Sequence, residues 1–159
     1  MNAVAFPLLS VSDSGEVSLQ HGGRSREEIR DAILELKDQL LGVAGESMDL
    51  PVDHEFCDGM YVRTLHIPKG TLLVGKIHRQ PCINWLAKGE MSLLTEFGST
   101  RVKAGFMAQS KAGIQKLGYA HEDSVFVNVF RTNETDIARI EQVVACESYE
   151  AVNAHEVLT

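Results

Sequence analysis

Apolar residues recur every three or four positions near the start of this chain, a period that indicates an amphipathic helix. Ser25 and Glu28 have the spacing of a capping box, and Gly42 follows the last apolar positions as a terminator. We therefore predict a helix over residues 25–42 that packs on the outside of the domain or against a second copy. Its apolar stripe consists of Ile29, Ile33, Leu36, Leu40 and Leu41.

Between residues 50 and 131 the apolar residues form short runs that are separated by turn formers. Residues 125–130 alternate valine with phenylalanine or asparagine, so this segment has two different faces. Short strands at such spacing are typical of an all-β sandwich or barrel. The helical period returns over residues 135–146, where Thr135 or Asn133 can serve as the N-cap. We predict a second helix there, packed on the barrel.

The first 24 residues are rich in serine and glycine, which favour turns. They predict an irregular arm that is either disordered or adds a strand to a neighbouring molecule. A chain of 159 residues has room for one domain with a core. The arm, the two helices and the strands of residues 50–131 are therefore expected to form a single domain.

The composition narrows the class of protein. Hydrophobic residues make up 44% and the net charge is -7, with 22 acidic and 15 basic side chains. An acidic chain without a basic stripe is not expected to bind nucleic acid. No apolar run approaches the ~18 residues that a membrane helix needs. The apolar patch at residues 4–9 has no basic residue before it, so we predict no secretory signal peptide.

The three cysteines predict neither a disulfide framework nor a structural zinc site. Cys57, Cys82 and Cys146 are scattered, and none belongs to a Cys-x-x-Cys pair. A reducing compartment such as the bacterial cytoplasm fits this usage.

The glycine spacing that begins at Gly70 resembles the first cupin signature. Gly70 and Gly89 match glycines of that signature. Lys76, His78 and Cys82 stand where the family has His, His and Glu.

The second cupin signature follows at the expected distance. Gly105 and Gly113 match its glycines, and Lys116 stands at the place of the last metal-binding histidine. Three of the four usual metal ligands are therefore replaced. The resemblance implies a mainly β fold, a cupin-like double-stranded β-helix (jelly-roll barrel) of the RmlC-like superfamily over residues 50–131, with a helix before it and another after it.

Three further segments resemble cupin-like proteins encoded by tailed bacteriophages, a group of unassigned function. They are residues 75–78, 90–98 and 118–123, and the likeness extends to Thr135-Asp136 at the start of the last helix. This resemblance implies a phage origin, and hence a location in the host bacterial cytoplasm or in the virion.

Two interpretations of the polar residues in the signatures remain open. Lys76, Lys116 and His78 could hold a small anion such as a carboxylate, a phosphate or a sugar acid. Alternatively, the lysines extend to the mouth of the barrel and His78 is a satisfied core histidine. The full candidate ligand pocket consists of Lys76, His78, Cys82, Asn84, Lys116 and Tyr119.

We expect no metal cofactor, because two lysine ammonium groups beside a divalent cation would repel it. If a transition metal does bind, the ligands that remain are His78, Cys82 and His121. His121 otherwise caps or solvates a turn beside two acidic residues.

No catalytic residue is assigned, since the chain has no Gly-x-Ser-x-Gly elbow and no His-Glu-x-x-His motif. The main hypothesis is a non-catalytic phage accessory protein that acts through protein contacts, as a virion component or an intracellular binding module. Its expected partners are further copies of itself and other phage or host proteins. The alternative is a small-molecule-binding or enzymatic cupin with a pocket around His78, Lys76 and Lys116.

Overall fold

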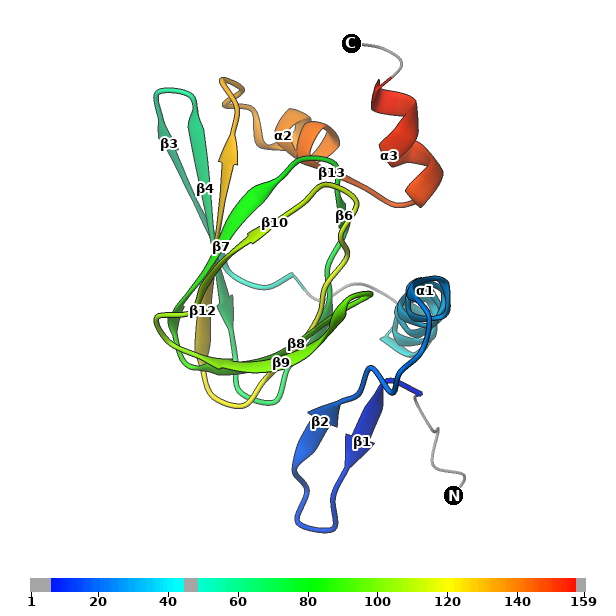
Figure 1. The fold of residues 1–159 in the computed structure, drawn as a ribbon. Coiled ribbons are helices and arrows are strands. Elements are labelled where there is room, and N and C mark those ends of the chain that lie inside the picture. Colours follow the sequence, from blue (N-terminus) through cyan, green and yellow to red (C-terminus); the bar gives the residue numbers. More distant parts are fainter. Residues whose placement is uncertain (1–6, 45–48, 157–159) are drawn as a thin grey trace.

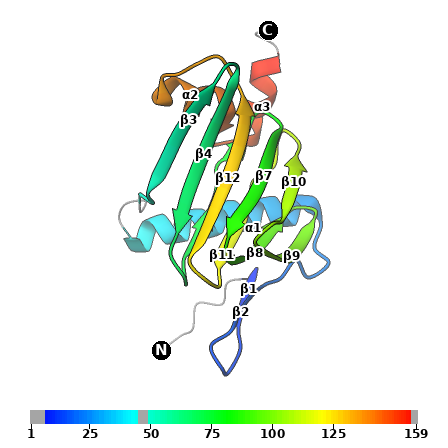
Figure 2. The same cartoon turned by 90° about the vertical axis from the view of Figure 1, so that its left-hand side faces the viewer.

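The computed structural model describes residues 7–44 and 49–156 and is built on two antiparallel β-sheets that face each other (Figures 1 and 2). The first sheet has the strand order β10-β7-β12-β4-β3, with β10 at Met107–Ser110, β7 at Cys82–Lys88, β12 at Ser124–Arg131, β4 at Met60–Ile67 and β3 at Val52–Cys57. The second has the order β5-β11-β8-β9, with β5 at Leu72–Val74, β11 at Leu117–Ala120, β8 at Glu90–Thr95 and β9 at Gly98–Lys103.

The chain passes back and forth between the two sheets. After β7 it crosses to β8 and β9, returns for β10, crosses again for β11 and returns for β12. This alternation is the jelly-roll winding that the glycine spacing predicts, and the mainly β fold is confirmed. Over the described residues the two hydrogen-bonded ladders stay separate, so the sheets form a sandwich rather than a closed barrel.

The run at residues 71–79 is divided into two strands. β5 ends at Val74, and the Gly75 amide donates to the Lys116 carbonyl at 2.9 Å. The chain then forms β6 (Ile77–His78), which pairs with β13 (Ala145–Cys146) instead of continuing along the second sheet. Pairing with β13, near the C-terminal end of the chain, therefore determines where His78 lies.

Helix α1 (Arg26–Ala44) begins with the predicted capping box. The Ser25 amide donates to Glu28 Oε2 at 2.7 Å, and the Glu28 amide donates to Ser25 Oγ at 3.2 Å. The stripe residues Ile29 and Ile33 are buried against Leu94 of β8. The helix thus covers the outer face of the second sheet, as Figure 2 shows behind the strands. No helix of the described residues is long and apolar enough to span a membrane.

A buried carboxylate joins α1 to the turn after β8. Glu96 is 5% exposed and accepts hydrogen bonds from Arg26 Nε at 3.1 Å and from Arg30 Nε at 2.6 Å. Arg30 Nη2 adds a second bond to the other carboxylate oxygen at 3.1 Å, so the pair is bidentate. The pKa of Arg30 is raised, chiefly by its hydrogen bond to Glu96.

The segment predicted as an irregular arm contains a β-hairpin. Strands β1 (Leu9–Val11) and β2 (Val17–Leu19) pair across a turn, in which Ser12 Oγ accepts a hydrogen bond from the Glu16 amide at 3.0 Å. Leu8 and Leu19 are buried in the same cluster as α1. This burial orders the hairpin on its own chain, which local turn composition alone does not predict. Residues 1–6 of the predicted arm lie outside the described residues.

The second helix is shorter than predicted. α2 (Ile137–Val144) has Asp136 as its N-cap, whose carboxylate accepts a hydrogen bond from the Arg139 amide at 3.1 Å. It ends where the chain becomes extended at Ala145 to form β13. α3 (Tyr149–Glu156) follows, where no element was predicted. The apolar side of α2 covers one end of the space between the sheets (Figure 1).

Gly89 and Gly70 provide a matched test of whether close packing at a turn requires glycine. Both have positive φ, but a Cβ at Gly89 would collide with Ser124 Oγ and lie 2.6 Å from the Asp123 carbonyl, while one at Gly70 meets nothing within 4 Å. We expect Gly89→Ala to lower the free energy of unfolding by about 3 kcal/mol or more, and Gly70→Ala by about 1 kcal/mol. Denaturant titration measures both, and equal losses would show that the close approach at Gly89 is unimportant.

Removing the charge of Glu96 tests the link between α1 and the second sheet. Glu96→Gln keeps the shape but leaves two guanidinium groups without their anion, so we expect a loss of about 2 kcal/mol in the free energy of unfolding. Glu122→Gln, at an exposed position, is the control and should change it by less than about 0.5 kcal/mol. Hydrogen exchange should speed up in α1 of Glu96→Gln, and unchanged exchange there would contradict the assignment.

Candidate functional site

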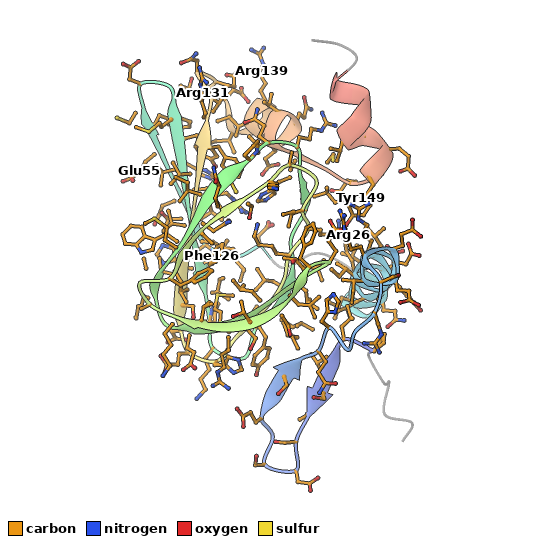
Figure 3. All side chains as sticks on the ribbon, in the orientation of Figure 1. Arg26, Glu55, Phe126, Arg131, Arg139 and Tyr149 are labelled. Carbon is orange, nitrogen blue, oxygen red and sulfur yellow. The ribbon has the colours of Figure 1, made fainter. Side chains whose placement is uncertain are left out.

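A layer of polar side chains lies inside the sandwich between two apolar clusters. One cluster, around Leu86 and Phe126, fills the middle of the sandwich. The other, around Tyr61 and Phe130, includes the buried face of α2. Figure 3 shows the side chains that fill the space between the sheets. The polar layer is formed by His78, Cys82, Asn84, Ser110 and Asn128, which we call the interior cluster.

Strand register places the two asparagines of the cluster side by side. Asn128 of β12 pairs with Asn84 of β7, and both are less than 5% exposed. Asn128 Nδ2 donates to Asn84 Oδ1 at 2.7 Å, and Asn84 Nδ2 donates to Ser110 Oγ at 2.6 Å. The buried amides therefore satisfy each other across three neighbouring strands.

His78 and Cys82 lie together at one end of this hydrogen-bonded chain. Cys82 Sγ is 3.5 Å from His78 Nδ1 and donates to Asn84 Oδ1 at 3.5 Å. The His78 ring packs edge-on against Phe130, with 5.4 Å between ring centroids. The structure thus brings together His78, Cys82 and Asn84 of the candidate pocket, although the strand through Pro81 is interrupted.

Burial keeps both groups uncharged at neutral pH. The pKa of His78 is lowered to about 3, first by desolvation and then by the positive charges of Lys116 and Arg63. The pKa of the Cys82 thiol is raised by desolvation, which Lys116 and the hydrogen bond with Ser110 partly offset. A neutral imidazole and a neutral thiol are therefore the forms present.

Lys116 also belongs to this interior. It precedes β11, and its Nζ atom is buried without a hydrogen-bond partner among the described residues. Desolvation lowers the pKa of Lys116, and Cys82 opposes this effect. The charge of Lys116 acts on the pKa values of both His78 and Cys82, so the three groups belong to one region.

The remaining two pocket candidates lie elsewhere. Lys76 falls between β5 and β6 and is exposed, with Nζ 3.7 Å from Glu147 Oε1. Tyr119 packs with the cluster that α1 covers, on the outer side of the second sheet. Its ring lies against His121, with 5.1 Å between centroids.

His121 is separated from the interior cluster. Its Nε2 atom lies 2.7 Å from Ser92 Oγ, and the pKa of His121 is lowered first by burial. Residues 7–44 and 49–156 contain no group of three or more His, Cys, Asp or Glu side chains that could hold a metal ion. The ligand set His78, Cys82 and His121 is therefore not assembled.

The interior cluster does not fit a divalent metal. His78 is a single imidazole, Cys82 is held as a thiol by its raised pKa, and Lys116 adds a buried amine at the place of a ligand. First-row metals need several anionic or imidazole donors that converge on one point. We therefore derive no chemistry through a metal here.

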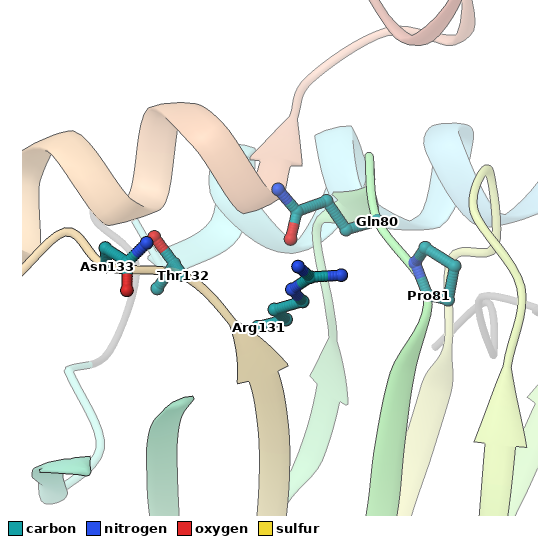
Figure 4. Close-up of a pocket in the computed structure, with 5 residues that line it drawn as sticks. All are labelled: Gln80, Pro81, Arg131, Thr132 and Asn133. Carbon is teal, nitrogen blue, oxygen red and sulfur yellow. The ribbon is translucent and has the colours of Figure 1, made fainter. Parts of the chain in front are cut away.

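A surface pocket lies at the end of the sandwich where His78 and Cys82 of the interior cluster are found. It has a volume of about 550 Å³ and is lined by Gln80, Pro81 and residues 131–133 (Figure 4). A second pocket of about 180 Å³ adjoins it and shares Thr132 and Asn133. Neither pocket is lined by a residue of the candidate ligand pocket predicted from the sequence. The sequence pattern does not reveal which turns meet at this end of the sandwich.

Comparison with known proteins defines the fold. No protein-family model matches the chain, and no curated protein matches it. Among solved structures, ectoine synthase from P. lautus has a TM-score of 0.52 at 13% identity, covering 64% of this chain and 77% of the other. KdgF from Halomonas sp. has a TM-score of 0.49 at 13% identity, with 58% and 88% covered. A cupin-2 domain containing protein from Shewanella frigidimarina has 0.45 at 8%, with 61% and 92% covered.

The chain therefore has the double-stranded β-helix fold of cupins, with helices on both sides of it in sequence. The ectoine synthase shows that an enzyme can have a similar fold. At such identities the likeness concerns the fold alone, so function has to be argued from this chain's own residues.

The low pKa of His78 predicts a specific dependence of stability on pH. The value is about 3 in the folded protein and about 6.5 in the unfolded chain, so only the unfolded state takes up this proton as the pH falls below 6.5. The stability that neutral His78 provides is complete above pH 6.5 and declines towards pH 3. We expect a loss of up to about 3 kcal/mol by pH 4 from this residue.

Denaturant titrations of wild type and His78→Asn at several pH values measure the contribution of His78 to the free energy of unfolding. Because the variant has no imidazole to protonate, its free energy of unfolding should fall less between pH 7 and pH 4 than that of wild type. Parallel curves for the two proteins would show that His78 is not held neutral by its surroundings.

Proposed function

We propose that this chain is a non-catalytic accessory protein of a tailed bacteriophage that acts through protein contacts. The resemblance of residues 75–78, 90–98 and 118–123 to phage proteins supports the phage origin. The interior supports the non-catalytic part, because the side chains of the cupin ligand region hydrogen-bond mainly to one another. The observation that carries the contact function is an exposed apolar face on the first sheet.

This face lies on the outer side of β7, β10 and β12. Ile83 and Trp85 are 43% and 42% exposed, and Met107 is 61% exposed. The register places Met107 beside Trp85 on one side and Val127 beside it on the other. Large apolar side chains that adjoin one another on a surface are typical of interaction sites. We call Ile83, Trp85 and Met107, together with Val127, which is only 6% exposed, the sheet face.

The proposed occupant of the sheet face is a second copy of this chain. The outward positions at its centre carry no charge, whereas the whole chain has a net charge of -7. Two such acidic molecules approach with least repulsion where neither presents a carboxylate. A two-fold axis would bring the same patch of both copies together, with Trp85 near its centre.

The charged residues beside the sheet face fit the rim of such an interface. Arg131 is the last residue of β12, and Glu55 lies on β3, which is separated from β12 by β4; Figure 3 labels both residues. Interfaces commonly have an apolar centre and a polar edge. Dimers built in this way can serve either in the virion or as an intracellular binding module. Mass spectrometry of purified particles of the encoding phage distinguishes these two roles.

Replacing Trp85 tests the contact function. We expect wild type to form dimers and Trp85→Glu to weaken dimerisation by at least about 30-fold, because a carboxylate would be buried at the centre of the interface. Sedimentation velocity over a range of concentrations measures both. Val11→Glu is the control, since Val11 is 59% exposed on the distant hairpin, and it should leave dimerisation unchanged.

A monomeric wild type at every concentration would overturn the second copy as the occupant. Equal effects of Trp85→Glu and Val11→Glu would show that association uses another surface. Circular dichroism of the variants confirms that both retain the fold.

A further inference from the structure

We infer that Lys116 forms a binding site for a small monovalent anion inside the sandwich, at the place where the cupin pattern has a metal ligand. The observation that carries this inference is geometric. The Nζ atom of Lys116 is buried and has no hydrogen-bond partner among the described residues. This inference goes beyond the proposed contact function and does not depend on it.

An isolated ammonium group is costly to bury. Transfer of a charged group away from water without a partner costs several kcal/mol, on the order of the whole stability of a small domain. The charged form of Lys116 therefore needs an anion, and no carboxylate of the described residues hydrogen-bonds to its Nζ atom. Two carboxylates form ion pairs with other basic residues. Glu96 pairs with Arg30, and Glu147 pairs with Lys76.

Arg63 adds a second positive charge to the same region. It pairs in register with Asn128 on β12, so it lies on the inward face of β4. Arg63 and Lys116 both lower the pKa of His78, which places the charge of each near the imidazole. A guanidinium stays protonated under all ordinary conditions. Two basic side chains therefore act on the imidazole of His78, while the carboxylate of Glu141 acts together with Arg63 on Tyr61.

The surrounding groups determine what kind of anion fits. Asn84, Asn128 and Ser110 hydrogen-bond to one another, so they offer few free donors to a ligand. The ammonium of Lys116 can donate three hydrogen bonds. A halide or a short carboxylate such as formate or acetate matches a single buried ammonium, whereas a bulky anion such as a sulfonate would need more donors and more space.

Thermal unfolding of the full chain at constant ionic strength tests the inference. The bulky anion isethionate is replaced stepwise by chloride, formate or acetate, and the Tm is measured. Binding to the folded state alone raises the Tm with the logarithm of anion concentration, and we expect a rise of about 5 °C at high excess. Chloride as the strongest ligand would indicate a halide site, and acetate or formate a carboxylate site.

Two charge-matched variants locate the effect. Lys116→Met removes the buried ammonium and should abolish the anion-dependent rise in Tm. Lys76→Met removes one positive charge from the surface and should retain the full rise, because Lys76 is exposed beside Glu147. Trp85→Glu should also retain it, so failure of the contact function and failure of the anion site are distinguishable.

Two outcomes would overturn the anion site. One is a wild-type Tm that depends on ionic strength but not on which anion is present, which is the behaviour of a neutral, ligand-free Lys116. The other is a rise in Tm that persists in Lys116→Met. If that variant does not fold, line broadening of the chloride-35 NMR signal by wild type, reversed by acetate, answers the same question.

Discussion

The hydrogen bonds that join Asn84 to Asn128 and to Ser110 hold the middle of this sandwich together. Buried amides must find partners, and here they find them only if β7, β10 and β12 keep their observed register. That register turns Asn84 inward and Trp85 outward, because side chains alternate along a strand. These two hydrogen bonds therefore favour the register in which Asn84 faces the interior and Trp85 belongs to the sheet face.

The interior combines neutral polar groups with a buried amine. His78 and Cys82 remain neighbours, but burial keeps both neutral, and Lys116 brings a buried amine to the position of a metal-binding histidine. Positive groups inside and an uncharged apolar face outside favour different partners, a small anion and a second protein molecule. The proposed anion site lies inside the sandwich and the sheet face lies outside it, so the two proposals can be tested separately.

Elements outside the cupin strands complete the architecture. Glu96 holds α1 on the second sheet through Arg26 and Arg30. β13 pairs with β6 and so sets the position of His78, while α2 covers the adjacent end of the sandwich. The terminal segments thus help to shape the interior that the central strands enclose.

The sequence by itself determined the fold class and the capped start of α1, because glycine spacing and capping residues are local properties. Only the tertiary structure decided that Lys116 is buried while Lys76 reaches Glu147, and that Tyr119 packs under α1. The break between β5 and β6 separates the two lysines, and it depends on pairing with β13, about 70 residues away along the chain. Contacts between such distant segments leave no periodic signal in the sequence, so the hairpin, the ion pairs of Glu96 and the content of the interior had to come from the fold.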